Sequence, residues 1–250
     1  LNKKFEVNDL GDLHWYLAIK VEREDGVFKL SQEQYVKAII AAANLPKGEL
    51  VAKATPETEV LMKLTKEMGP QTEEEKKDMA LVPYRQILGM LMYLMVCCRP
   101  DIMHACKMLA QFCTNPGKQH WTAMKRVLRY LAGTADLQLC LRGGEEPPLL
   151  EVFVDADGSD GFAAEGRGVL GVLSSITTLT DEHGVPVRAF FKWYAPFTTT
   201  VSRSDAETEL MGIDQGHRDG IYCRGICKDL GAKQRVRTTV FSDCRSLDLR

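Results

Sequence analysis

The most informative stretch of this sequence reads Leu149-Leu150-Glu151-Val152-Phe153-Val154-Asp155. An apolar run of this length that closes on a carboxylate predicts a β-strand whose last side chain faces whatever lies beyond the sheet. Further elements are predicted downstream: strands at 169–179, 187–194 and 237–243, and a helix over about 204–229. Three strands, a helix and a strand predict an α/β domain with a mixed sheet over residues 148–250. Its boundary is the Gly-, Glu- and Pro-containing segment 143–148.

Three carboxylates occupy structurally special places in this domain. Asp155 ends the first strand, Asp243 ends the last, and Glu209 lies in the first turns of the helix. If the three converge, their negative charge needs cations. Mg²⁺ prefers carboxylate oxygens, and pairs of such ions ~3.5–4 Å apart clamp the attacking and leaving oxygens of phosphodiesters. The alternative is three unrelated carboxylates, since Asp and Glu are mostly solvated and Asp commonly ends strands and caps helices.

The residues upstream of the boundary predict a β-hairpin followed by helices. The hairpin has strands at 13–21 and 27–30 around a turn at 22–26. A helix follows, with Ser31 and Gln34 as its capping box, and ends near Asn44. This part of the chain, residues 1–44, is therefore distinct from the helical region 45–142 that follows it.

The helical region begins with a loose connector over 45–78, whose charged end at 72–78 reads as a solvated helix start. Apolar residues at helical spacing then predict three helices: 84–98, a second that starts at Pro100, and 118–133.

Basic side chains gather in the helical region. The segment from Arg99 to Arg142 has seven Lys and Arg against two Asp, a local charge of +5. Four of these side chains lie on or near one helix and could follow a phosphate backbone: Lys118, Lys125, Arg126 and Arg129. The alternative, which the sequence alone favours, is the solvated face of an amphipathic helix.

Composition is that of an ordinary folded protein. The 250 residues carry a net charge of −2, with 45% hydrophobic and 26% charged residues. None of the eight cysteines forms a C-x-x-C pair, and Cys97, Cys106 and Cys113 fall on apolar helical stripes. Reduced core thiols, and hence a reducing intracellular compartment such as cytoplasm or nucleus, are expected. No signal peptide or long apolar run is present, so no membrane partner is expected.

One glycine pattern matches a dinucleotide-binding motif but lacks the structural context of that motif. Residues 166–171 match G-x-G-x-x-G, which binds dinucleotides only where a strand precedes it and a helix opens on it. Here the glycines lead into a strand-like stretch, so dinucleotide binding is not expected.

Several strings together identify a resemblance. In order along the chain, they are 5–17 (FEVNDLGDLHWYL), 30–35 (LSQEQY), 83–85 (PYR), 99–102 (RPDI), 115–121 (NPGKQHW) and 125–134 (KRVLRYLAGT). Over nearly its whole length the chain resembles the Pol polyprotein of copia-type LTR retrotransposons, in the part that follows the polymerase active site and includes the RNase H domain.

The resemblance implies a function. It assigns residues 1–44 to the end of a reverse transcriptase palm with a primer-grip-like hairpin, 45–142 to a helical thumb- or connection-like region, and 148–250 to an RNase H-like domain. The family's Asp-Ala-Asp is matched at Asp155, its Ala-Glu-Ala-Glu string at Glu209, and its Cys-Asp-Asn string at Asp243. The expected cofactor is Mg²⁺ (or Mn²⁺), and the expected partners are an RNA–DNA hybrid and the rest of the Pol polyprotein.

Departures from the family pattern keep alternatives open. The polymerase's Tyr-x-Asp-Asp motif is absent, so polymerisation is not expected. Gly158 replaces a Trp, and residues 195–198 replace a Ser-Lys-Lys-Gln string. The chain begins with Leu1 and stops at Arg250, before the family's fourth carboxylate, so a fragment with a truncated RNase H domain is expected. The alternatives are a catalytically dead nucleic-acid-binding module and a degenerate retroelement relic.

Overall fold

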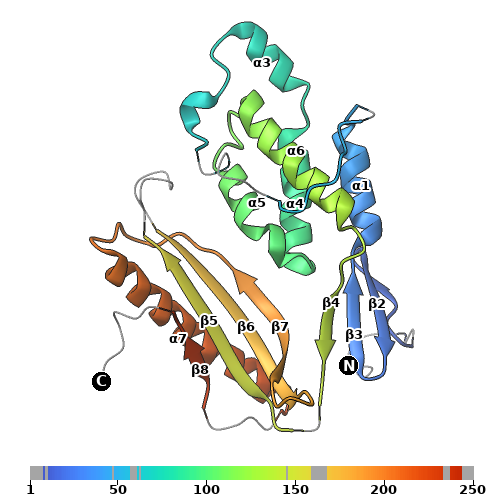
Figure 1. The fold of residues 1–250 in the computed structure, drawn as a ribbon, viewed down its shortest axis with the longest axis vertical. Helices are drawn as coiled ribbons and strands as arrows, with labels where there is room; N and C mark the ends of the chain where they lie inside the picture. Colours follow the sequence, from blue (N-terminus) through green and yellow to red (C-terminus); the bar gives the residue numbers. More distant parts are fainter. Residues whose placement is uncertain are drawn as a thin grey trace.

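The computed structural model describes residues 8, 11–46, 48–56, 61, 63–144, 146–158, 168–232 and 237–243. The fold is mixed α and β, with two four-stranded sheets and a group of packed helices (Figure 1). The helices lie together at one end of the molecule. One sheet extends from them, and the second sheet, with its own long helix, lies alongside.

The first sheet is antiparallel and has the strand order β1-β2-β3-β4. Its strands are β1 (Trp15–Tyr16), β2 (Ile19–Glu24), β3 (Val27–Ser31) and β4 (Leu139–Arg142). The predicted hairpin is confirmed, but its turn is shorter than 22–26, because Asp25 and Gly26 with positive φ suffice to reverse the chain. The continuous strand predicted over 13–21 is wrong, since Leu17 and Ala18 both have positive φ and interrupt it.

Strand β4 was not predicted, and it joins two segments that the sequence suggested were separate. It pairs antiparallel with β3, with Leu141 opposite Phe28 and Cys140 opposite Lys29. The end of the helical region is thereby held in the same sheet as the hairpin.

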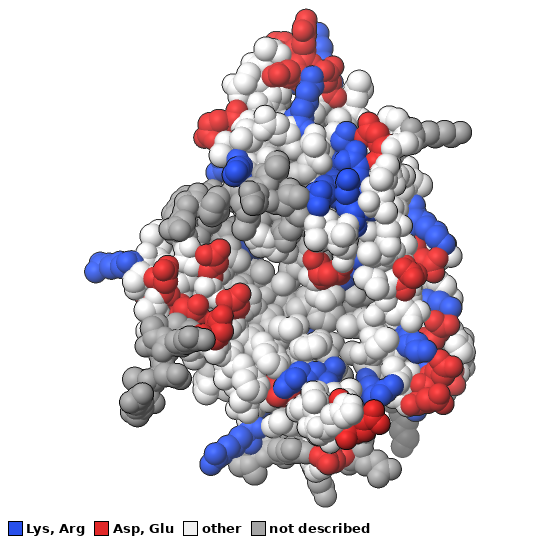
Figure 2. All heavy atoms as spheres, in the orientation of Figure 1, with Lys and Arg blue, Asp and Glu red and all other residues white. Residues whose placement is uncertain are grey.

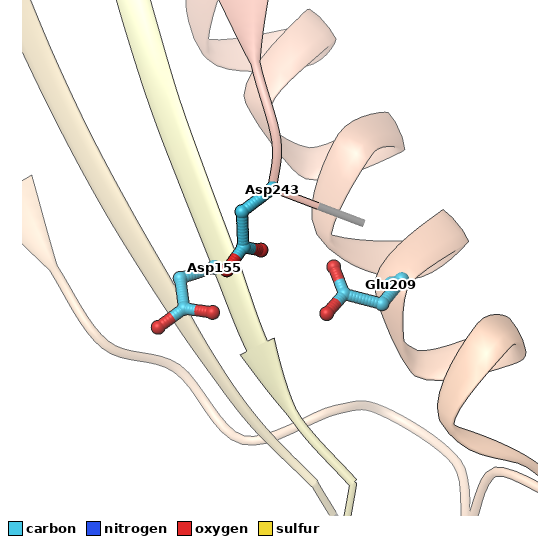
Figure 3. Close-up of side chains that lie close together, drawn as sticks. All are labelled: Asp155, Glu209 and Asp243. Carbon is cyan, nitrogen blue, oxygen red and sulfur yellow. The ribbon is translucent and has the colours of Figure 1, made fainter. Parts of the chain in front are cut away.

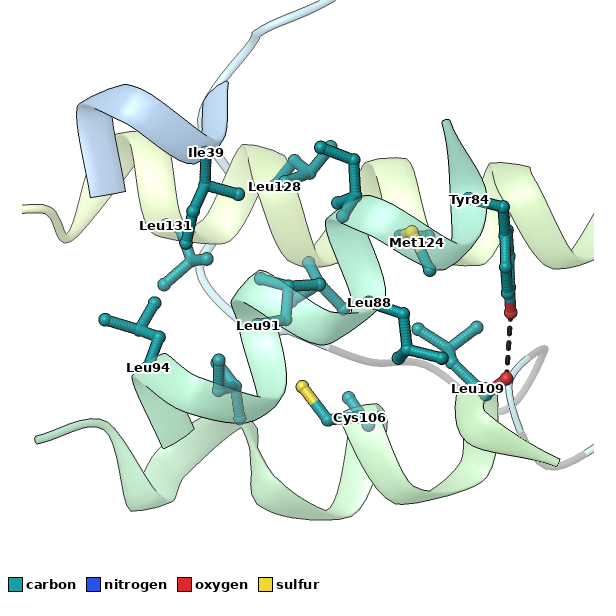
Figure 4. Close-up of a cluster of buried hydrophobic side chains, with 14 of the residues drawn as sticks. Ile39, Tyr84, Leu88, Leu91, Leu94, Cys106, Leu109, Met124, Leu128 and Leu131 are labelled. Atoms are coloured by element: carbon teal, nitrogen blue, oxygen red, sulfur yellow. Dashed lines mark hydrogen bonds between the residues drawn. The ribbon is translucent and has the colours of Figure 1, made fainter. Parts of the chain in front are cut away.

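The helices enclose one hydrophobic core. They are α1 (Glu33–Ala43), α3 (Glu73–Ala80), α4 (Tyr84–Cys97), α5 (Met103–Ala110) and α6 (Lys118–Gly133), with short 3₁₀ turns η1 (Lys66–Met68) and η2 (Pro100–Ile102). Figure 4 shows Ile39, Leu91 and Leu131 meeting from three different helices, and all three are fully buried. The hydroxyl of Tyr84 donates a hydrogen bond to the carbonyl oxygen of Leu109 (2.9 Å), so the buried polar atom is satisfied.

Some helix starts were predicted correctly from the sequence and others were not. The predicted capping box of Ser31 and Gln34 is wrong, because Ser31 pairs with Lys20 as the last residue of β3 and α1 begins after Gln32. At α3 the predicted helix start is confirmed, and Thr72 forms a capping box with Glu75. The helix expected from Pro100 begins as η2 and becomes α5 at Met103.

The second sheet is mixed, as predicted, with the order β7-β6-β5-β8. It consists of β5 (Leu149–Asp157), β6 (Val169–Thr180), β7 (Pro186–Tyr194) and β8 (Thr239–Phe241), and it is covered by α7 (Asp205–Asp229). Strand β5 pairs antiparallel with β6 and parallel with β8. The glycine pattern at 166–171 leads into β6, as expected, and its first two residues lie outside the described residues.

The two parts of the molecule meet through the chain and through side chains. The predicted boundary, 143–148, lies between β4 and β5. The indole Nε1 of Trp193 on β7 donates a hydrogen bond to the carbonyl oxygen of Met95 on α4 (2.7 Å). Among the described residues, no single helix is long and apolar enough to span a membrane. Helices α3 and α4 pass that test only as a pair, and they are bent by 47°.

Candidate metal centre

Two of the three predicted carboxylates are brought together by parallel strand pairing. In the register of β5 and β8, Phe153 lies opposite Phe241, and the two rings stack at 4.9 Å. Asp155 follows Phe153 by two residues within β5, which continues to Asp157, and Asp243 follows Phe241 by two residues. Strand β8 ends at Phe241, so the strand predicted over 237–243 is too long and Asp243 lies just beyond its end. The register of the two strands therefore brings the two carboxylates close together at this edge of the sheet (Figure 3).

Glu209 comes from α7, whose start is well defined. The hydroxyl of Ser204 accepts a hydrogen bond from the backbone N–H of Glu207 (3.3 Å), which caps the helix. Glu209 then lies in the second turn and points from α7 toward the two aspartates (Figure 3).

Three glycines spaced one turn apart face the sheet from α7, and two of them permit its close packing. A Cβ atom on Gly216 would lie 2.5 Å from Cγ1 of Val154, and one on Gly220 would lie 3.0 Å from Cγ2 of Thr238. A Cβ atom on Gly212 would lie 3.5 Å from Cβ of Ala156, an ordinary van der Waals contact. The helix therefore approaches β5 more closely than any larger side chain would allow, and this brings Glu209 within reach of the strand ends.

The three carboxylates form one cluster. One carboxylate oxygen from each of Asp155, Glu209 and Asp243 can be chosen so that all three lie within 4.8 Å of one another. Asp155 and Asp243 are exposed and Glu209 is half-buried. In the described part of the chain, no Lys or Arg forms an ion pair with any of them.

The electrostatics of the cluster favour a bound cation. Partial burial and then the charges of Asp243 and Asp155 raise the pKa of Glu209 above its usual value of 4.5, and the Ser242 hydroxyl, which donates to Glu209 Oε2 at 3.5 Å, opposes this. Like charges at such distances repel unless a cation lies between them. Oxygen-only ligands of this kind fit Mg²⁺ or Mn²⁺, which also keep water ligands and take oxygens from a substrate phosphate.

The four predicted nucleic-acid-binding side chains are not part of this cluster. They lie on α6, in the helical part of the molecule, and three of them contact the connector that precedes α3. Lys125 forms an ion pair with Glu49 (2.9 Å), and the guanidinium of Arg129 donates to the Glu49 carbonyl oxygen. Arg126 donates to the Thr55 hydroxyl (2.8 Å).

The fourth basic side chain has a different partner. Lys118 forms an exposed ion pair with Asp78 at 3.0 Å. A role of any of the four toward nucleic acid stays a prediction.

Sequence reasoning missed the residues that support the cluster. Glycines at positions 212, 216 and 220 were visible as a spacing of four, which predicts a glycine stripe along one helix face. Gly158 was noted only as a departure, yet a Cβ there would lie 2.1 Å from Oδ1 of Asp205. Among the charges that raise the pKa of Glu209, that of Asp205 has the smallest effect.

Comparison with known proteins finds Pol polyproteins of transposons among the relatives of this chain. No family model matches the chain. It is similar to the "Retrovirus-related Pol polyprotein from transposon TNT 1-94" of Nicotiana tabacum, with 35% identity over 251 residues, which is 100% of this chain and 18% of the relative.

Two further relatives come from Arabidopsis thaliana and bear the names of transposons RE1 and RE2. The RE1 Pol polyprotein is 33% identical over 97% of this chain, and the RE2 Pol polyprotein is 36% identical over 63% of it. The chain spans only 15% and 10% of these two relatives.

Proposed function

Because the chain belongs to the Pol polyproteins of copia-type retrotransposons, we propose that its second sheet and α7 form an RNase H-type nuclease unit. The reaction is metal-dependent hydrolysis of the RNA strand in an RNA–DNA hybrid. The observation that carries the proposal is the convergence of Asp155, Glu209 and Asp243 from two strands and one helix.

In this proposal the three carboxylates are the metal ligands. Asp155 and Asp243 are fixed by the β5–β8 pairing, and Glu209 is fixed by the packing of α7 on that pair. Two bound Mg²⁺ or Mn²⁺ ions would supply water activation at the attacking side and charge stabilisation at the departing 3′ oxygen. Exposure of the two aspartates leaves the cluster open to a phosphodiester from solvent.

The helical part of the molecule is the proposed hybrid-binding surface. Figure 2 shows acidic side chains grouped over the second sheet, both basic and acidic side chains over the helices, and a largely uncharged surface between them. Phosphate contacts from Lys and Arg hold a duplex without reading its sequence, and 2′-hydroxyl contacts distinguish RNA from DNA. A hybrid that spans both surfaces would place a phosphate at the carboxylates.

The test is cleavage of a labelled RNA–DNA hybrid by the full chain with Mg²⁺. The Asp155→Asn variant should lose at least about a hundredfold in rate, since even partners of metal ligands commonly contribute roughly 10–100-fold. The matched control is Asp214→Asn, which removes a carboxylate that pairs with Arg218 on α7 outside the cluster. It should cleave as the original chain does.

Three results would overturn the proposal. They are hybrid binding by the folded chain without cleavage, cleavage that continues in EDTA, and equal activity of the two variants. Circular dichroism of each variant establishes that it is folded.

A further inference from the structure

A second site of a different character lies between the helices and the second sheet. A cavity of about 510 Å³, open to solvent on one side, lies between α4 and α5 and the end of β7 with the segment after it. Its lining is apolar for the most part, with Met92, Met95 and Met103 from the helices facing Trp193 and Phe197. The volume is within the range of ordinary small-molecule sites, ~300–1,000 Å³.

One charged side chain lines this cavity. Among the described residues that line it, Lys107 of α5 alone is charged. Its Nζ atom is inaccessible to solvent and has no hydrogen-bond acceptor among those residues. It lies 3.7 Å from the centre of the Phe197 ring, which it contacts as a cation on an aromatic face. Burial lowers the pKa of Lys107 to about 8, so the ammonium form is still the main one at neutral pH.

An ammonium without an oxygen acceptor lacks the partner that buried charges require. Buried charged groups are normally paired, because an unpaired one carries a large desolvation penalty. The Phe197 ring offsets only part of this penalty, since a cation–π contact is weaker than a charge-assisted hydrogen bond to a carboxylate. The cavity is therefore apolar and contains one buried ammonium that lacks an anionic partner.

We propose that this cavity binds a small amphipathic carboxylate, an aliphatic or arylalkyl acid, whose apolar body fills the methionine-lined space and whose carboxylate pairs with Lys107. Because the lining has one cation, a ligand with one negative charge matches it. A nucleotide or a sugar phosphate would bury many polar groups against apolar walls without partners. Unbranched methionine side chains adapt to apolar bodies of different shape.

The proposed ligand reaches the ammonium by displacing the ring of Phe197, which lies against it. The ring of Phe197 covers Nζ, while the backbone around it is fixed, because Leu170 N–H donates to the Pro196 carbonyl (2.9 Å) and Thr198 N–H donates to the Gly168 carbonyl (2.8 Å). In the proposed complex the ring swings aside while this backbone stays in place, and the carboxylate takes the position of the ring at Lys107.

The test is isothermal titration of the full chain with decanoate and with decanol, which share the same alkyl body. Decanoate should bind at least about tenfold more tightly, since a charge-assisted hydrogen bond is worth more than a neutral one. Lys107→Met should remove this preference and leave decanol binding unchanged, which also shows that the cavity is intact. The matched control, Lys66→Met, replaces an exposed lysine outside the lining and should keep the preference.

A second variant tests whether the Phe197 ring limits access to Lys107. Phe197→Ala exposes the ammonium and should strengthen decanoate binding relative to decanol. Three results would overturn the proposal: equal affinity for decanoate and decanol in the original chain, a preference that persists in Lys107→Met, and no binding of either compound to the folded chain.

Discussion

Gly216 of α7 lies against Val154 of β5 so closely that a Cβ atom on the glycine would come within 2.5 Å of the valine Cγ1. Val154 directly precedes Asp155, and Gly216 lies about two turns after Glu209 on the same helix. The distance between two of the three carboxylates is therefore set by a glycine that touches neither of them.

This relationship predicts the effect of a single methyl group. Gly216→Ala should destabilise the chain by about 1–3 kcal/mol, the usual effect of overpacking, and weaken Mg²⁺ binding because α7 must move away from β5. The measurements are urea unfolding and Mg²⁺ titration. Gly225→Ala is the matched control, since nothing lies within 4 Å of its added Cβ and alanine favours a helix by up to about 1 kcal/mol. Equal behaviour of the two variants would contradict the close-packing argument.

The raised pKa of Glu209 predicts a pH dependence of the metal-free protein. Above the ordinary value of 4.5 the folded chain holds a proton on Glu209 that the unfolded chain has released. Stability contributed by this group is therefore fully present below pH 4.5 and is lost as pH rises through the folded-state pKa. With EDTA present, the melting temperature of the original chain should fall relative to that of Glu209→Gln over this window.

Mg²⁺ should reverse that loss. Ions that bind the ionised cluster stabilise the folded state by mass action, so the melting temperature at pH 7 should rise with Mg²⁺ concentration. Asp155→Asn should show the opposite balance, with a more stable metal-free form and little response to Mg²⁺. A Mg²⁺ response of the same size in Asp155→Asn would argue against the cluster as the binding site.

His120 predicts acid sensitivity of the helical part. Its Nδ1 accepts a hydrogen bond from Gly117 N–H (2.8 Å), its Nε2 lies 3.0 Å from the Thr65 carbonyl oxygen, and its ring stacks on Phe112 at 4.1 Å. Since Nδ1 must accept, the neutral ring carries its proton on Nε2. Burial lowers the pKa of this imidazole below 6.5, so the unfolded chain binds a proton more readily.

Stability should therefore fall as pH drops below about 6.5 toward the folded-state pKa of His120. His120→Leu should be less stable at pH 7, by about 1–3 kcal/mol for each polar group left unpaired, and should lose this part of the pH dependence. Urea unfolding between pH 5 and 8 measures both effects. The exposed His183, changed to Leu, should leave the profile unaltered.

The candidate site was largely predictable because its carboxylates stand at ends of elements that periodicity identifies. The strands next to Asp155 and Asp243 need only pair in parallel to bring the two together, and an α/β order of elements favours that pairing. The exact strand ends were not predicted, since β5 continues to Asp157 and β8 stops at Phe241. Glu151, which interrupts the apolar run, is tolerated inside because Arg188 and Thr177 bind its carboxylate at 3.0 and 2.7 Å.

Features decided by distant partners were not predictable. Strand β4 is short, and its pairing with β3 is a tertiary contact more than a hundred residues away along the chain. Ser31 has the local pattern of a helix cap, but its pairing with Lys20 overrides that preference. The basic face of α6 reads as solvated or nucleic-acid-binding, whereas the connector that lies across it supplies partners at Glu49 and Thr55.

The connector over α6 leads to a prediction that separates two roles of Lys125. If this side chain only anchors the connector, Lys125→Ala should leave hybrid affinity unchanged. We expect instead that affinity falls and that the slope of log affinity against log salt decreases by about one unit, as for one phosphate contact. Glu49→Gln should strengthen hybrid binding, because it releases Lys125 from the Glu49 carboxylate, whereas Arg129 keeps its hydrogen bond to the Glu49 backbone carbonyl oxygen. Fluorescence anisotropy at several salt concentrations measures both variants, and weaker binding by Glu49→Gln would show that the intact connector, rather than the free cations, forms the surface.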